Sequence, residues 1–106
     1  MSQRESNLSR RIMDALRAEG AYCIKIHGSE YMQAGTPDIQ GCYRGMFFAF
    51  ETKLPEKRSN TSAMQDRQMD KIRKAEGVAQ VVCTPAEAVL AMEDAWEKFL
   101  ARISES

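Results

Sequence analysis

The sequence has 106 residues with 15 basic and 15 acidic side chains, so its formal net charge is zero. This length predicts a single domain, residues 1–106, with one modest hydrophobic core. Zero net charge argues against indiscriminate binding to nucleic acid, and no apolar run approaches the roughly 20 residues of a membrane span. The first residues, MSQRESNLSRR, do not form a signal peptide.

The cysteines and the histidine restrict metal and redox chemistry. The three cysteines, Cys23, Cys42 and Cys83, are odd in number and fall in predicted strands, so we expect buried, reduced thiols in an intracellular protein. The chain has no C-x-x-C pair and His27 is its one histidine, which argues against a structural zinc site.

Residues 2–19 are predicted to form the first helix. Ser2 and Glu5 match an S-x-x-E capping box, and Gly20 is a natural C-terminal stop. The buried stripe of this helix consists of Leu8, Ile12, Ala15 and Leu16. Glu5 shares that inward face, so it is either a capping residue or a functional group directed toward a site.

Residues 21–27, AYCIKIH, alternate in the manner of a strand. Cys23, Lys25 and His27 lie on one side of this strand. The strand leads into a glycine-bounded loop that delivers the chain to Pro37 and Asp38. A lone histidine is more often an ordinary polar surface residue than a catalytic one.

A hairpin is predicted next. Ile39–Tyr43 can extend, Arg44-Gly45 can turn, and Met46–Thr52 can form the second strand. Side chains alternate along a strand, so Glu51 and Lys53 share one face. The opposite face, directed into the core, carries Met46, Phe48 and Phe50.

The hairpin can bring Asp38 near Glu51, although twelve residues separate them in the sequence. Two carboxylates that share a site repel each other unless a hard cation lies between them, and Mg²⁺ prefers carboxylate oxygens. We therefore expect neutralisation of either carboxylate to raise the stability of the metal-free protein or leave it unchanged. Lys53 beside such a cation can orient a water molecule or neutralise a phosphate oxygen.

Residues 54–61, LPEKRSNT, form a polar segment that we expect to be a mobile flap beside the site. Ser62 and Gln65 then match a second capping box at the start of a helix that Gly77 ends. Residues 53–74 contain seven basic and three acidic side chains. Such a run is either a solvated helix face or a positive surface for phosphates.

The last two predicted elements are a strand and a helix. Residues 78–83, VAQVVC, are a near-continuous apolar run that fits a buried strand, and Thr84-Pro85-Ala86-Glu87 is a capping box that starts the helix. The helix carries a heptad-like stripe of Val89, Met92, Trp96, Phe99 and Ile103. This stripe either covers the sheet or contributes to a homodimer interface.

The element order is therefore helix, three strands, helix, strand, helix, which predicts an α/β fold with a mixed sheet flanked by helices. Within it, PD followed by E-x-K resembles the signature of the PD-(D/E)XK nuclease superfamily. The ordered neighbours KIHG, GTPDIQG, FETK, a basic loop and a helix starting near Gln65 resemble the VRR-type nuclease (VRR-NUC) domain, especially its stand-alone phage forms. The resemblance covers residues 4–85 and implies a restriction-endonuclease-like αβββαβ core, followed here by a C-terminal helix.

The resemblance implies a metal-dependent, structure-selective DNA endonuclease that hydrolyses phosphodiester bonds, in the manner of a Holliday-junction resolvase. It implies Mg²⁺ or Mn²⁺ on Asp38 and Glu51, with Glu5 and the Thr52 carbonyl as further ligands. Lys53 would position the attacking water, and Gln65 would act in the site instead of serving only as a cap. Candidate substrate contacts are Lys25, His27, Lys57, Arg58, Arg67 and Lys71.

Several alternatives remain open from the sequence. A flap or restriction-like nuclease would use the same chemistry, and a catalytically idle module would bind nucleic acid without cutting it. The stand-alone phage proteins of this type imply a homodimer acting on branched DNA, in the cytoplasm of a bacterial host if the protein is phage-encoded. No organic cofactor, covalent intermediate or membrane partner is expected.

Overall fold

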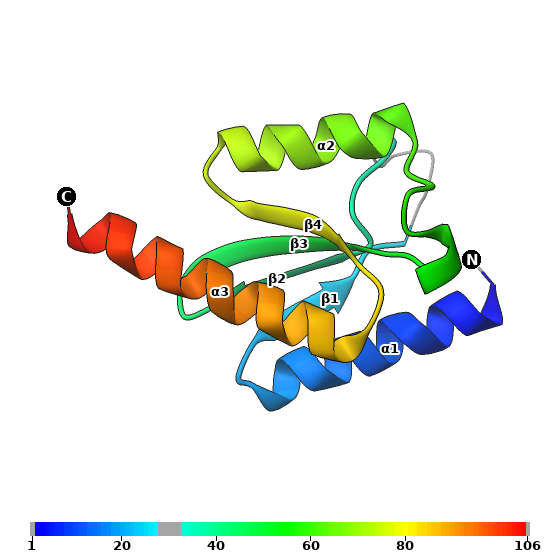
Figure 1. Ribbon diagram of the computed structural model, residues 1–106, viewed down its shortest axis with the longest axis horizontal. Coiled ribbons are helices and arrows are strands. Elements are labelled where there is room, and N and C mark those ends of the chain that lie inside the picture. The colour runs from blue at the N-terminus through cyan, green and yellow to red at the C-terminus, as the bar shows by residue number, and fades with distance from the viewer. Residues whose placement is uncertain (1, 28–32, 106) are drawn as a thin grey trace.

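The computed structural model describes residues 2–27 and 33–105. Figure 1 shows a sheet with helices on both of its faces. In chain order the elements are α1 (Gln3–Ala18), β1 (Tyr22–Lys25), β2 (Ile39–Tyr43), β3 (Met46–Thr52), the 3₁₀ helix η1 (Pro55–Lys57), α2 (Ala63–Lys74), β4 (Val78–Val82) and α3 (Pro85–Ser104). Among the described residues, no helix has the length and apolar character needed to cross a membrane.

The sheet is mixed, as the sequence predicts. Its strand order is β1-β2-β3-β4, with antiparallel pairing among the first three strands and parallel pairing of β4 with β3. A parallel pair needs a crossover connection, which η1 and α2 supply. Helices α1 and α3 pack against each other on one face of the sheet, and α2 covers the other face over β4 (Figure 1).

The main core lies between the sheet and the layer of α1 and α3. Its fully buried side chains include Ile12, Leu16, Phe48, Phe50 and Met92. The predicted inward face of β3 is confirmed, because Met46, Phe48 and Phe50 are at most 1% exposed whereas Phe47 is 44% exposed. Their burial stabilises the layer by removing apolar surface from water.

The hairpin turn fixes the register that the site depends on. Arg44 and Gly45 have φ values of 52° and 88°. Two successive positive φ values are typical of a two-residue type I′ turn. The turn pairs Tyr43 with Met46 and, at the other end of the hairpin, Ile39 with Phe50. The next residue along each strand is a carboxylate, so this register sets Asp38 opposite Glu51.

At Gly35, the segment before Asp38 packs against the start of α2. It has a positive φ of 83°, and a Cβ atom at this position would collide with the backbone of Met64 and come within 2.6 Å of the Gln65 nitrogen. Only glycine allows this backbone conformation and this approach without strain. The chain that enters the site is therefore held directly against the first turn of α2.

One prediction about the surface is wrong. Cys42 is exposed, because it pairs with Tyr22 and Phe47 on a part of the sheet that α2 does not cover. The segment predicted to be a mobile flap begins with Leu54, which is 6% exposed, and continues through the turn of η1; its mobility stays a prediction.

Two ion pairs hold this turn to the helices on either side. Glu56 pairs with Arg4 of α1 at 2.7 Å. Arg58 makes a bidentate pair with Glu87 of α3, at 2.7 and 3.1 Å. Glu87 also accepts a hydrogen bond from the Cys83 N–H at 2.6 Å, so the predicted capping box at Thr84 is modified there.

Candidate active site

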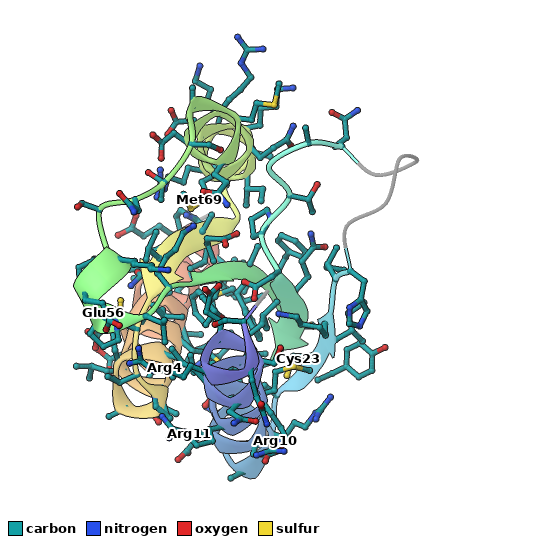
Figure 2. The ribbon with its side chains drawn as sticks, turned by 90° about the vertical axis from the view of Figure 1, so that its right-hand side faces the viewer. Arg4, Arg10, Arg11, Cys23, Glu56 and Met69 are labelled. Atoms are coloured by element: carbon teal, nitrogen blue, oxygen red, sulfur yellow. The ribbon has the colours of Figure 1, made fainter. Side chains whose placement is uncertain are left out.

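The sequence-predicted acidic residues lie at the end of the sheet where β2 begins and β3 ends. Figure 2 looks onto this end of the molecule, with α1 below the sheet, α2 above it and η1 on the left. The labelled Arg4 and Glu56 mark the ion pair that joins α1 to η1. Elements from both halves of the chain therefore surround the site.

Asp38 is held by three hydrogen bonds from three different elements. Its Oδ1 accepts the backbone N–H of Thr52, in β3, at 2.7 Å. Its Oδ2 accepts the Lys25 ammonium of β1 at 2.6 Å and the Ser9 hydroxyl of α1 at 3.1 Å. Lys25 also donates to the Ser9 oxygen at 3.1 Å. Asp38 is 8% exposed, so its carboxylate has lost most of its hydration. The hydrogen bonds compensate for most of that loss.

Local sequence explains how these donors reach Asp38. Lys25 is the last residue of β1 and shares the face of the buried Cys23, because side chains alternate along the strand. Ser9 lies on the buried stripe of α1 next to Leu8 and is 1% exposed. The Ile26 N–H donates to the Asp38 carbonyl at 2.7 Å and extends the β1–β2 pairing by one step, which fixes the Asp38 backbone.

Glu51 has a different environment. It is 7% exposed, and its pKa is raised to about 7 from an ordinary value of 4.5. Burial is the largest cause, followed by the negative charge of Asp38. The charges of Lys53 and Lys25 and the Asp38 N–H lower this pKa without cancelling the effect of burial. A substantial fraction of Glu51 therefore carries a proton at neutral pH in the metal-free protein.

Lys53 follows the last residue of β3 and is partly buried. Its N–H donates to the Val82 carbonyl at 3.1 Å, so the pairing with β4 continues past Thr52. Its charge lowers the pKa of Glu51, which indicates that the ammonium acts on that carboxylate at short range. The structure thus brings Asp38, Glu51 and Lys53 together at one end of the sheet.

Glu5 lies one turn before Ser9 on α1 and is partly buried. Its N–H donates to the Ser2 hydroxyl oxygen at 3.2 Å, and its Oε1 accepts from the same hydroxyl at 3.3 Å. Within residues 2–27 and 33–105, no three His, Cys, Asp or Glu side chains are grouped so as to hold a metal ion. Glu5 therefore caps its helix here, and its assignment as a ligand stays a prediction.

Gln65 also has a capping role. Its Oε1 accepts the Ser62 N–H at 2.9 Å, and its own N–H donates to the Ser62 hydroxyl oxygen at 3.1 Å, which completes the predicted capping box. Its backbone touches Gly35, three residues before Asp38. A catalytic role for the side chain stays a prediction, and that role would compete with the bond to Ser62.

The six candidate substrate contacts fall into two groups. Lys25 and Arg58 are engaged within the protein, by Asp38 and Glu87 respectively. The other four side chains are exposed: His27, Lys57, Arg67 and Lys71. Arg67 and Lys71 line a shallow hollow on α2 together with Asp66 and Asp70, so acidic neighbours reduce the positive field on that surface.

Sequence reasoning missed Ser9 and assigned Lys25 a different role, that of a substrate contact, whereas it pairs with Asp38. The available signal was a polar residue where the pattern requires an apolar one. Ser9 is adjacent to Leu8 on the inward side of α1, and Lys25 lies on the same face of β1 as the buried Cys23. Polar side chains at such positions are buried only when they have hydrogen-bond partners, so they indicate a buried polar network.

No protein-family model and no curated protein matches the sequence. Several solved structures are similar to it, including the following two. A structure described as a VRR_NUC domain has a TM-score of 0.66 and 23% identity, over 87% of this chain and 97% of the other. Hjc from Archaeoglobus fulgidus, a Holliday junction resolvase, has a TM-score of 0.59 and 20% identity, over 74% of this chain and 67% of the other. The chain therefore has the α/β fold of the VRR_NUC domain and of Hjc, as the sequence resemblance predicts.

Proposed function

We propose that the protein is a metal-dependent, structure-selective DNA endonuclease that hydrolyses phosphodiester bonds, with a four-way junction as its preferred substrate. A fold hosts many functions, so the proposal depends on the site. One observation carries it. Asp38 and Glu51 stand opposite each other at one end of the sheet, with Lys53 two residues beyond, in a fold found in a VRR_NUC domain and in a Holliday junction resolvase.

The donor set fits a hard divalent cation. Its acidic side chains offer carboxylate oxygens, which Mg²⁺ and Mn²⁺ prefer as ligands. The charge of Asp38 raises the pKa of Glu51, so the two carboxylates repel each other and a shared cation would relieve that repulsion. The buried Thr52 hydroxyl has no hydrogen-bond partner among the described residues, and the backbone N–H of the same residue donates to Asp38.

We assign Asp38 and Glu51 as the principal ligands, with Glu5 and the Thr52 carbonyl as additional candidates. A bound Mg²⁺ or Mn²⁺ would supply charge stabilisation at the phosphate during in-line displacement. Lys53 would donate a hydrogen bond that orients the attacking water or neutralises a phosphate oxygen. The site uses neither histidine nor cysteine as a nucleophile, so the chemistry proposed is direct hydrolysis.

The decisive experiment is incubation with labelled four-way junction, flap, single-stranded and linear duplex DNA in Mg²⁺, Mn²⁺ or chelator. We expect cleavage that requires the metal and prefers the junction. Cleavage in chelator would contradict the metal assignment. Preference for the flap or the linear duplex would favour the corresponding nuclease, and binding without cleavage in either metal would identify a catalytically idle module.

We also propose a homodimer, because symmetric resolution of a junction needs two matched incisions. The last turns of α3 extend beyond the sheet (Figure 1), and Leu100 and Ile103 there are 45% and 50% exposed. Trp96 is less suitable, because it packs edge-on against Tyr43. The edge strand β1 is the other candidate interface. Sedimentation of a monomer that still makes paired cuts would contradict the dimer and leave the nuclease proposal intact.

The proposed DNA substrate places the protein inside a cell, in the bacterial cytoplasm if a phage encodes it. Cys23 and Cys83 are buried free thiols, which agrees with a reducing environment.

A further inference from the structure

Lys25 places a positive charge beside the two carboxylates of the site. Its ammonium is 2.6 Å from Asp38 Oδ2, and the two side chains are only 19% and 10% exposed. Water and salt screen such a pair weakly. The charge of Lys25 also lowers the pKa of Glu51, so one ammonium acts on both carboxylates.

Ser9 fixes this arrangement. Its hydroxyl donates to the same Asp38 oxygen and accepts from Lys25, so three polar groups from α1, β1 and the start of β2 form a closed triangle. Ser9 is 1% exposed, and a hydroxyl so deeply buried keeps its orientation only through these bonds. The ammonium is therefore positioned by the fold and is not simply a surface charge near the site.

We infer that Lys25 is an internal counter-cation, which holds Asp38 in the metal-free protein and competes with a divalent cation for this carboxylate. The inference rests on the proposed function, because it takes Asp38 as a metal ligand. Lys25 is then a positioning residue whose role differs from that proposed for Lys53. Its long flexible stem allows the ammonium to withdraw when a second cation approaches.

A buried carboxylate without a counter-charge is strongly unfavourable, so Lys25 stabilises the folded chain when no metal is bound. Two cations at one carboxylate repel each other, so a divalent ion held by Asp38 would weaken or displace the contact of Lys25 with that carboxylate. That displacement offsets part of the binding energy and lowers the metal affinity.

The test is a titration of the full chain with Mn²⁺, without DNA, by isothermal calorimetry. Lys25→Met keeps the length of the side chain and removes its charge. We expect this variant to bind Mn²⁺ about tenfold more tightly than the parent, since removal of a cation from a weakly screened site changes affinity by at least that order. Its unfolding temperature should fall in chelator and rise more steeply with Mn²⁺ than that of the parent.

Arg17→Met is the matched control. Arg17 belongs to the same corner of α1 and β1, where it donates to the Cys23 carbonyl at 3.0 Å, so the control removes one positive charge without touching Asp38. Its Mn²⁺ affinity should equal that of the parent. An equal gain in Arg17→Met and Lys25→Met would show a general charge effect and overturn the inference.

Ser9→Ala keeps every charge and covers the case in which Lys25→Met does not fold in chelator. Loss of the hydroxyl removes one of the hydrogen bonds that hold Lys25 at Asp38, so we expect Mn²⁺ binding to tighten by a smaller factor, about two- to threefold, the order of one lost hydrogen bond. Mn²⁺-dependent folding of Lys25→Met would also support the inference. Unchanged or weaker binding in both variants, with the parent binding Mn²⁺, overturns it and leaves the nuclease proposal standing. Absence of binding in every protein contradicts the metal assignment and the inference with it.

Discussion

The two carboxylates of the site are almost equally buried, at 8% exposed for Asp38 and 7% for Glu51, yet their surroundings differ. Asp38 accepts hydrogen bonds from Lys25, Ser9 and the Thr52 N–H. Glu51 has a pKa raised to about 7, chiefly because burial disfavours its charged form. The Asp38 side is therefore organised before any ligand arrives. A bound cation would change the protonation of Glu51 more than the arrangement around Asp38.

This difference shows that burial alone does not determine the effect of a carboxylate on stability. Matched donors offset the cost of burying a charge, so removing one partner destabilises the fold, whereas a buried charge without donors destabilises the fold by itself. Substitutions on the two sides should consequently have opposite effects.

Lys53, on the Glu51 side, should matter for chemistry and little for folding. We expect Lys53→Ala to lower the rate of junction cleavage on the order of 10²-fold or more, because the transition state loses several kcal/mol of charge stabilisation. Junction binding and the unfolding temperature should change little. Lys98→Ala removes an exposed lysine of α3 and should cleave at the parent rate. A folded Lys53→Ala protein with parental activity would exclude the proposed role.

Asp38→Asn should destabilise the metal-free protein. The sequence alone suggested a neutral or favourable effect, and the structure reverses that expectation because Lys25 compensates the charge of Asp38. Removal of the Asp38 charge leaves the Lys25 ammonium, whose side chain is 19% exposed, without this counter-charge, which costs about 3 kcal/mol of unfolding free energy. Urea unfolding in chelator measures this loss, with the exposed Asp66→Asn as control. Equal stability of Asp38→Asn and the parent would show that the Lys25 pair contributes nothing.

Glu51→Gln should stabilise the metal-free protein, and only at high pH. The folded-state pKa of Glu51 is raised above 4.5, so the parent has its full stability below pH 4.5 and loses part of it as the pH rises through about 7. Glutamine has no proton to lose. We therefore expect no difference at pH 4.5 and a gain of about 2 kcal/mol at pH 8.5, reduced from the full shift by solvent screening. Urea unfolding measures the stability difference between Glu51→Gln and the parent. The same difference at both pH values would contradict the raised pKa of Glu51.

The sequence predicted the Glu51 side of the site better than the Asp38 side, and the reason is the range of the interactions. The placement of Asp38 opposite Glu51 depends on strand alternation and on the Arg44-Gly45 turn, both of which are local patterns. The bond from Ser9 to Asp38 spans 29 residues and depends on how α1 packs on the sheet. No local pattern specifies that packing.

The same limit applies to the surface. The pair of Arg58 with Glu87 also spans 29 residues, so the polar segment after β3 looked unanchored in the sequence. The exposure of Cys42 depends on which part of the sheet α2 covers, and amphipathicity of the helix does not determine its lateral position. Capping signals are local, so the capping box at Ser62 and the N-cap at Ser2 could be located correctly, although Glu5 accepts from the Ser2 hydroxyl and does not complete a box there.

The two-residue turn at Arg44 and Gly45 also has a consequence for the order of folding. A hairpin closed by such a turn forms within about 1–10 μs, whereas the parallel pairing of β4 has to wait for the crossover through α2. We therefore expect Asp38 and Glu51 to meet early, while the chain around them is still hydrated. Their mutual repulsion is weak in water and strengthens only as α1 and Lys25 close over the strands. The packing of α1 over the strands, and not the closure of the hairpin, should then be the step whose rate depends on the charge of the site.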